Sequence, residues 1–212
     1  MKHYFRTVFY LILIIGLSCA KAGAYEDFFI AINRDDDRTV AKLLERGFDP
    51  NSRDPKGQTG LILALRDDSP RVAETLWRSP QLDVNAENAS GENALMMAAL
   101  RGQVAWMERL LGRGAQAHKE GWSPIHYAAT GQEAKAVALL LGRGAPVEAL
   151  SPAKDTPLMM AARYGAEGSV DLLLARGASA SAKNERNLDA TDLARAGGRD
   201  FLLERLQRSV KR

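Results

Sequence analysis

Six short blocks along the chain share one order of polar and apolar positions. Each block opens with a polar residue, continues with a run of mainly apolar residues and closes on alanine. The blocks begin at Glu26, Thr59, Asn93, Ser123, Thr156 and Asp189, at intervals of 33, 34, 30, 33 and 33 residues. A period of this length is typical of stacked repeats, in which each repeat buries its apolar face only against its neighbours. Such a stack presents surface and seldom encloses a reaction chamber, so the pattern favours a binding protein.

Residues 156–188 illustrate the elements that one repeat predicts. Thr156 and Pro157 suit a helix start, because threonine caps free amides and proline needs no N–H in the first turn. We expect Gly165 to end this helix in a left-handed turn, and Gly177 to end a second helix in the same way. Residues 178–188 then form an extended loop, here called a finger, that leads into the next repeat. The predicted apolar faces comprise Leu158, Met160, Ala161 and Ala162 on the first helix and Val170, Leu172, Leu173 and Leu174 on the second.

The pattern closely resembles the ankyrin repeat over residues 25–207. The best matches are Ser123–Ala129 (SPIHYAA) with Leu139–Ala145 (LLLGRGA), and Thr156–Ala162 (TPLMMAA) with Leu172–Ala178 (LLLARGA). The resemblance implies an all-α solenoid of about six helix-turn-helix repeats joined by finger loops. The predicted single domain, 25–212, divides into repeats at 25–57, 58–91, 92–121, 122–154, 155–187 and 188–212.

Some repeats depart from the family pattern. The finger after Gly114 is three residues short, the second repeat carries one extra residue near Ser79–Leu82, and the finger at 150–153 lacks the family's Asp and Gly. The two ends are predicted to be polar caps, which keep a stack soluble. At the C-terminal end we expect Phe201, Leu202, Leu203 and Leu206 to face inward and Arg199, Glu204, Arg205, Arg208 and Lys211 to face water.

The N-terminus has the pattern of a secretory signal peptide over residues 1–24. Lys2 and Arg6 precede an apolar run that is too short to span a membrane, and small residues follow it. Cleavage after Ala22 and cleavage after Ala24 both fit. We expect no stable membrane anchor afterwards, and lipidation of Cys19 is not favoured because the usual Leu three positions earlier is Gly16. The predicted location is periplasmic or secreted, and a bacterial source is expected.

Charge and cysteine content narrow the classes of partner. Three of the 29 basic residues and none of the 26 acidic residues lie in residues 1–24, so the remainder is neutral and a general attraction to nucleic acid is not supported. The one cysteine lies in the same segment, so we expect no disulfide. A monomer that needs no cofactor is expected.

The residues offer little basis for catalysis or metal binding, and we expect no enzyme. Outside the leader, only His118 and His126 remain as histidines. The resemblance implies that His126 hydrogen-bonds between adjacent loops, whereas His118 is expected to be solvated. The run Asp35–Asp37 lacks the spacing of a calcium loop and is interpreted as a helix cap.

Trp77 and Trp106 are predicted to be buried. Trp122, which follows a finger glycine, either anchors a partner or fills the space left by the short finger.

The resemblance also assigns partner contacts to the fingers and to the ends of the first helices. The finger set is Lys56, Gln58, Ser90, Glu92, Lys119, Glu120, Trp122, Asp155 and Arg186. The first-helix set is Arg34, Arg66, Asp67, Leu100, Arg101, Thr130, Arg163 and Tyr164. With four arginines in the second set, we expect a cationic and aromatic groove that binds an acidic protein surface. The alternatives are an anion- or glycan-binding module, a secreted effector, or arginines that serve only solubility.

Overall fold

The computed structural model describes residues 23–210, so the predictions for most of the leader and for Lys211 lie outside the described residues. The chain divides into two compact units, Met1–Leu82 and Asp83–Arg212. We refer to their described parts as the N-terminal unit (23–82) and the C-terminal unit (83–210). Within residues 23–210 there are helices and one isolated antiparallel bridge, between Arg53 and Thr59, but no strand. The all-α prediction is confirmed.

The N-terminal unit packs two helix pairs around an apolar core. Residues 23–33 are helical and are followed by α2 (Asp37–Glu45), α3 (Gly60–Arg66) and α4 (Pro70–Trp77). Helix α4 packs against both α2 and α3. The fully buried side chains include Phe28, Ile32, Leu61, Ile62, Leu65 and Leu76. Asp36 caps α2 by accepting a hydrogen bond from the Thr39 N–H, which confirms that this acidic run is a helix cap.

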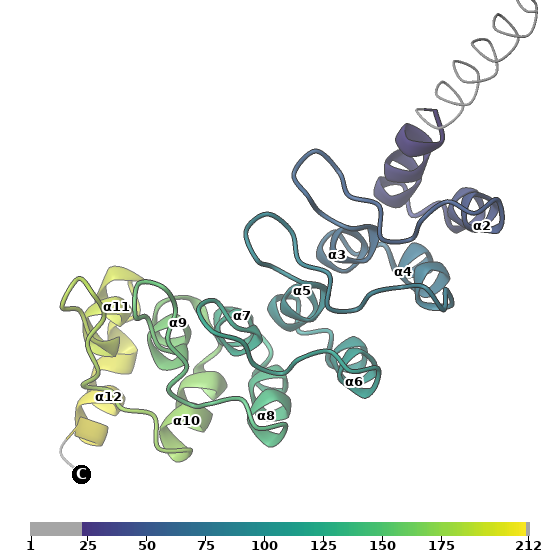
Figure 1. The fold of residues 1–212 in the computed structure, drawn as a ribbon. Coiled ribbons are helices and arrows are strands. Elements are labelled where there is room, and N and C mark those ends of the chain that lie inside the picture. Colours follow the sequence, from purple (N-terminus) through teal and green to yellow (C-terminus); the bar gives the residue numbers. More distant parts are fainter. Residues whose placement is uncertain (1–22, 211–212) are drawn as a thin grey trace, which may run out of the picture. The chain divides into compact units, whose positions relative to one another are not determined.

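The C-terminal unit stacks four helix pairs side by side (Figure 1). Its helices are α5 (Ala94–Leu100), α6 (Val104–Gly112), α7 (Pro124–Thr130), α8 (Ala134–Gly142), α9 (Pro157–Tyr164), α10 (Glu167–Ala175), α11 (Ala190–Ala196), η1 (Asp200–Leu202) and α12 (Leu203–Val210). The first helices pack in the order α5, α7, α9, α11, and the second helices in the order α6, α8, α10. Each of the six predicted repeat ranges contains one helix pair.

Polar residues start the first helices as the pattern predicts. The side chain of Thr156 accepts a hydrogen bond from the Met159 N–H at 3.3 Å, and Asn93 and Asp189 cap α5 and α11 in the same way. Proline occupies the first turn of α7 and of α9. These caps satisfy amides that would otherwise lack partners at the helix start.

Glycine ends the first helices for a different reason from the one predicted. Helix α9 does stop at Gly165, but Gly165 has φ −83° and is extended, not left-handed. A Cβ there would lie 2.0 Å from the carbonyl oxygen of Ala129, in the preceding first helix. The other two glycines approach the preceding helix as closely. A Cβ on Gly131 would lie 2.6 Å from the Leu100 oxygen, and a Cβ on Gly197 would lie 2.5 Å from the Arg163 oxygen. The glycine therefore permits one repeat to approach the next.

The second helices do end as predicted, in left-handed glycines. Gly144 has φ +85° and Gly177 has φ +86°. The N–H of the alanine after each glycine reaches back to a helix carbonyl, from Ala145 to Leu140 and from Ala178 to Leu173, both at 3.0 Å. This closure satisfies the last carbonyls of each helix with backbone donors.

Several core positions are displaced by one residue from the prediction. In α9 the buried methionine is Met159, and Met160 is half-buried; in α10 only Val170 and Leu173 of the predicted face are buried. Spacings of three and four residues bring Leu158, Ala161 and Ala162 onto the face of Met159, but they leave Met160 to one side.

The predicted burial of both tryptophans is also wrong. Trp77 and Trp106 are half-buried because the residues beside them, Leu76 and Met107, fill the core.

The C-terminal cap differs from the prediction at Phe201 and at Arg199. Phe201 was expected inside, but the 3₁₀ turn η1 directs Leu202 inward and leaves Phe201 58% exposed. Arg199 was expected in water, but its guanidinium donates to the carbonyls of Ala161 and Ala162 at the end of α9. Arg205 pairs with Asp171 at 3.1 Å and with Glu167 at 3.5 Å.

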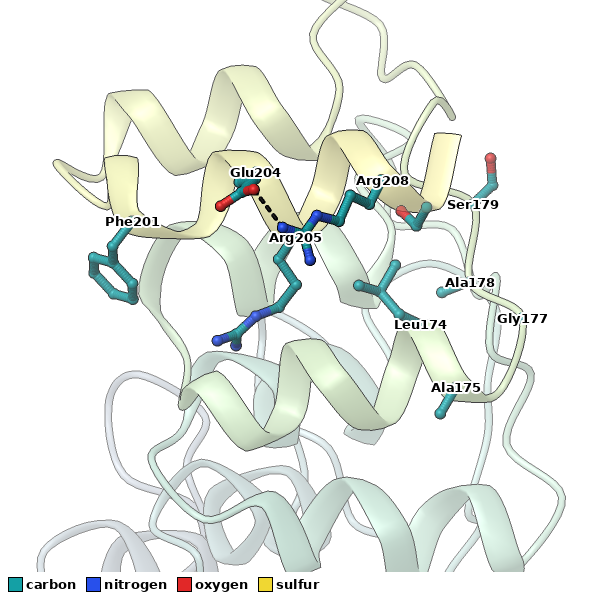
Figure 2. Close-up of a pocket in the computed structure, with 10 residues that line it drawn as sticks. Leu174, Ala175, Gly177, Ala178, Ser179, Phe201, Glu204, Arg205 and Arg208 are labelled. Carbon is teal, nitrogen blue, oxygen red and sulfur yellow. Dashed lines mark hydrogen bonds and ion pairs between the residues drawn. The ribbon is translucent and has the colours of Figure 1, made fainter. Parts of the chain in front are cut away.

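A cleft separates α12 from α10 (Figure 2). Phe201 lies at one end of this cleft, and Gly177 and Ser179 lie at the other. Leu174 and Ala178 contribute its apolar surface. No helix within residues 23–210 is both long enough and apolar enough to cross a membrane.

Candidate functional site

Each full-length finger is closed by one polar side chain. The Oδ1 atoms of Asp54, Asn88 and Asn184 each accept hydrogen bonds from the backbone N–H groups two and four residues further along, at 2.8–3.0 Å. Ser151 has this role in the finger that lacks the family's aspartate, since its Oγ accepts from the Asp155 N–H at 2.9 Å. The finger at 150–153 therefore keeps its turn although it departs from the family pattern.

The other missing family residue in that finger is a glycine. Gly57 and Gly91 have φ +76° and +74°, whereas the same place is held by Lys154 at φ +60° and by Asn187 at φ +58°. A left-handed conformation costs a residue with a Cβ about 1 kcal/mol. We expect Lys154→Gly to raise the free energy of unfolding by about 0.5–1 kcal/mol, measured by urea denaturation. An unchanged or lower midpoint would show that this backbone is not strained.

Successive fingers of the C-terminal unit are hydrogen-bonded to each other. The Lys119 ammonium donates to Glu87 at 2.5 Å and to the Gly91 carbonyl at 3.0 Å. Further along, the Glu185 N–H donates to the Ala153 carbonyl at 3.0 Å. The Asn184 side chain donates to the Asp155 carboxylate at 2.7 Å. These bonds fix the fingers relative to one another before any partner arrives.

His126 joins the start of α7 to the next finger, as the resemblance implies. Its ring is fully buried, and Nε2 lies 3.0 Å from the Ala149 oxygen and 3.2 Å from the Asp155 oxygen. Nδ1 accepts from the Ser123 N–H, so the proton of the neutral ring is on Nε2. Burial lowers the pKa of His126, although the backbone hydrogen bonds partly oppose this shift. The structural role is confirmed, and His118 is exposed as predicted.

Trp122 is half-buried and packs against neighbouring rings. Its ring meets His126 edge-on at 5.5 Å and Tyr127 at 6.3 Å. The Tyr127 hydroxyl donates to the Glu92 carboxylate at 2.8 Å, and burial raises the pKa of Tyr127. The tryptophan thus packs against the start of α7 while part of its surface stays accessible.

The ends of the first helices present cations and an aromatic ring. Arg101 is exposed and lines a shallow cleft with Leu100 and Thr130, between the ends of α5 and α7. The Arg163 guanidinium lies 4.9 Å from the centre of the Tyr164 ring, which is 47% exposed. Guanidinium groups stacked on rings still offer hydrogen-bond donors at their edges.

The N-terminal unit has its own cleft. It is lined by Tyr25, Glu26, Phe29, Ile30, Asn33, Asp54, Pro55, Leu63 and Arg66. Arg66 pairs with Asp67 at 2.7 Å and also donates to Gln58, while Arg34 and Lys56 are exposed. Ile30, 47% exposed, is an apolar residue that the polar-cap prediction overlooked.

The predicted contact residues therefore differ in accessibility. Glu120, Arg101 and Arg186 are exposed, Glu92, Lys119 and Arg163 are half-buried, and Asp155 is 8% exposed and occupied by Asn184. Sequence reasoning missed Leu150, which is 51% exposed on the finger beside Ser151. Its position in a finger without the family's usual residues was the available signal.

No group of three or more His, Cys, Asp or Glu side chains in the described part of the chain is arranged to hold a metal ion.

Comparisons with known proteins agree with this geometry. The model for ankyrin repeats in three copies matches residues 28–119 and 95–184. Human SH3 and multiple ankyrin repeat domains protein 2 is 37% identical over 153 residues, 68% of this chain. Human transient receptor potential cation channel subfamily A member 1 is 26% identical over 159 residues, 70% of the chain. Human neurogenic locus notch homolog protein 1 is 30% identical over 123 residues, 57% of the chain.

The matches cover only a small part of each relative. They span 8%, 14% and 5% of the lengths of these three proteins, respectively.

Proposed function

Because the chain belongs to the ankyrin-repeat family, whose members generally mediate protein–protein interactions, we propose that it is an exported module that binds another protein. The binding surface that we propose in the C-terminal unit consists of Arg101, Glu120, Trp122, Arg163, Tyr164 and Arg186, here called the finger face. These residues are exposed or half-buried and lie on the fingers and at the ends of the first helices.

The hydrogen bonds between neighbouring fingers are the observation that supports this proposal most strongly. Lys119 is hydrogen-bonded to Glu87 on the neighbouring finger, and Asn184 to Asp155. These bonds order the loops that carry Glu120 and Arg186 in the free chain. A surface that is ordered beforehand loses less conformational entropy on binding. Arginine, tryptophan and tyrosine are also the residues most enriched at the energetic centres of interfaces.

The partner surface that suits this face is acidic with apolar contacts. Arg101, Arg163 and Arg186 have no carboxylate partner among the described residues, so they are available for carboxylates of another protein. An anion- or glycan-binding module is the weaker proposal, because Arg66 already pairs with Asp67 and the fingers offer aromatic as well as cationic groups.

Export and action as a monomer in the periplasm or medium are further parts of the proposal. Export is supported by the pattern of residues 1–24, which lies almost entirely outside the described residues. Cell fractionation with mass analysis of the mature N-terminus tests export. Recovery of an uncleaved chain in the cytoplasm would contradict it.

The binding proposal is tested by affinity purification from the native compartment with three chains. One is wild type, one carries Arg101→Gln, Arg163→Gln and Arg186→Gln, and the control carries Arg113→Gln, Arg143→Gln and Arg176→Gln. The two variants lose the same charge on different surfaces. We expect a partner that the wild type and the control recover and that the finger-face variant recovers at least tenfold less. Equal recovery by all three chains would defeat the proposed surface.

A further inference from the structure

The N-terminal unit contains a cleft of about 430 Å³ that is not part of the proposed finger face. Three segments line it, namely the helix at 23–33, the finger residues 54–55, and α3. All three segments lie within residues 23–82, so the cleft is built inside one compact unit. Pockets that bind ligands commonly have volumes of roughly 300–1,000 Å³. The cleft is therefore large enough to admit a side chain of a partner.

The walls of the cleft are apolar and are fixed by their neighbours. Ile30 and Leu63 occupy the same position in successive repeats, and both line the cleft. Leu63 is 5% exposed and Ile30 is 47% exposed, so an apolar surface stays open at a position that the next repeat buries. In the same lining, the ring of Tyr25 meets the ring of Phe29 edge-on at 4.9 Å, and its hydroxyl donates to the Arg53 carbonyl at 2.7 Å. Covering this surface with apolar atoms of a partner would stabilise a complex.

The only cation in the lining of the cleft already has partners. The Arg66 guanidinium donates to both carboxylate oxygens of Asp67, at 2.8 and 2.7 Å, and also to the Gln58 side chain. Lys56 and Arg34 are exposed near the cleft along the chain, but neither of them lines it. The lining residues therefore present no unpaired positive charge to a ligand.

Two carboxylates in the lining can still receive a cation. Glu26 is exposed, and its side chain has no hydrogen bond or ion pair within residues 23–210. Asp54 uses Oδ1 to accept the two N–H groups that close its finger, both at 2.8 Å, while its Oδ2 accepts no hydrogen bond from the described residues. Because the charge of Arg66 is balanced by Asp67, the cleft as a whole is negatively charged.

We propose that this N-terminal cleft binds a segment of another protein in which a large apolar side chain is followed directly by a lysine or an arginine. The apolar side chain covers Phe29, Ile30 and Leu63, and the cation pairs with Glu26 or Asp54. The aromatic rings in the wall attract the cation as well. The charge of the cleft is opposite to that of the finger face, for which an acidic partner surface is proposed. The two sites therefore bind different segments, and neither proposal depends on the other.

Nuclear magnetic resonance of the isotope-labelled full chain tests the proposal with three peptides. The probe is acetyl-Gly-Ser-Phe-Lys-Ser-Gly-amide. One control peptide has glutamate in place of lysine, and the other has serine in place of phenylalanine. We expect the probe to shift the amide signals of Ile30, Asn33 and Leu63, with a dissociation constant on the order of 1 mM. The glutamate peptide should bind about threefold or more weakly, and the serine peptide should cause no saturable shift.

Variants of the chain assign the binding to the cleft. Ile30→Gln should weaken binding of the probe about fivefold to tenfold, and Glu26→Gln about twofold to fivefold. Leu150→Gln and Glu45→Gln are the matched controls, because they change an exposed leucine and an exposed glutamate that lie neither in the cleft nor in the finger face. Both controls should bind the probe like the wild type. Circular dichroism confirms that all four variants are folded.

Four results would overturn the inference. The first is the absence of probe-induced shifts at the cleft, and the second is equal affinity for the lysine and glutamate peptides. The third is an equal loss in Ile30→Gln and Leu150→Gln, which would indicate general apolar adhesion. The fourth is a dimer that Ile30→Gln dissociates, seen by analytical ultracentrifugation, which would assign the cleft to a second copy of the chain. Because partner recovery on the finger face is measured separately, failure here leaves the proposed function untouched.

Discussion

Replacing Gly165 by alanine is expected to lower the free energy of unfolding by about 3 kcal/mol or more. The new methyl group would lie 2.0 Å from the Ala129 oxygen and 2.9 Å from the Ala161 Cα, both backbone atoms. Neither can move without shifting a helix, so α9 must separate from α7. Urea denaturation followed by circular dichroism measures the change.

Gly142→Ala is the matched control for this variant. Gly142 is the last residue of α8, and a Cβ there would meet nothing within 4 Å. Alanine suits a helix better than glycine, so this variant should gain up to about 1 kcal/mol. A Gly165→Ala chain as stable as the control would show that the repeats do not pack this closely.

Removing His126 is expected to cost about 3 kcal/mol and to change how stability depends on pH. In His126→Ala the Ser123 N–H and the Ala149 and Asp155 carbonyls lose their partner. The pKa of the folded histidine lies below its ordinary value, so below about pH 6.5 the unfolded chain binds a proton that the folded chain does not. This contribution to stability is complete above that pH and is lost as the pH falls, by up to about 1.4 kcal/mol per unit.

The measurement is the urea midpoint of the wild type and of His126→Ala at pH 7.5 and pH 5.5. The exposed His118 provides the control, since His118→Ala removes a histidine that does not join a helix to the next finger. If His126→Ala retained the full loss of stability between these two pH values, another group would be responsible for it.

The helices and their starting points could be predicted from the sequence because they depend on local chemistry. Thr156 caps its own helix, and Gly177 ends one through its own backbone angle, so a single repeat contains the information. The role of Gly165 could not be predicted in the same way. Its reason is a carbonyl oxygen of Ala129, 36 positions earlier, which no local pattern reveals.

The loops to which the sequence assigns the proposed site are present in the structure, whereas the accessibility of individual residues in them could not be predicted as well. Asp155 has the register of a contact residue, but a hydrogen bond from Asn184 occupies it. Phe201 is a large apolar residue of the kind usually found in a core, yet its place in the 3₁₀ turn η1 exposes it. In both cases the outcome depends on the neighbouring repeat or on a turn type that the hydrophobic period does not encode.

The ordering of the fingers in the free chain is tested most directly by amide hydrogen exchange of the isolated protein. The N–H groups of Glu92, Glu185 and Leu188 are all hydrogen-bonded within or between fingers. We predict that they exchange roughly 100-fold or more slowly than in an unstructured peptide. Exchange of these fingers at the unstructured rate, while α5, α7 and α9 stay protected, would contradict a binding face that is formed before the partner arrives.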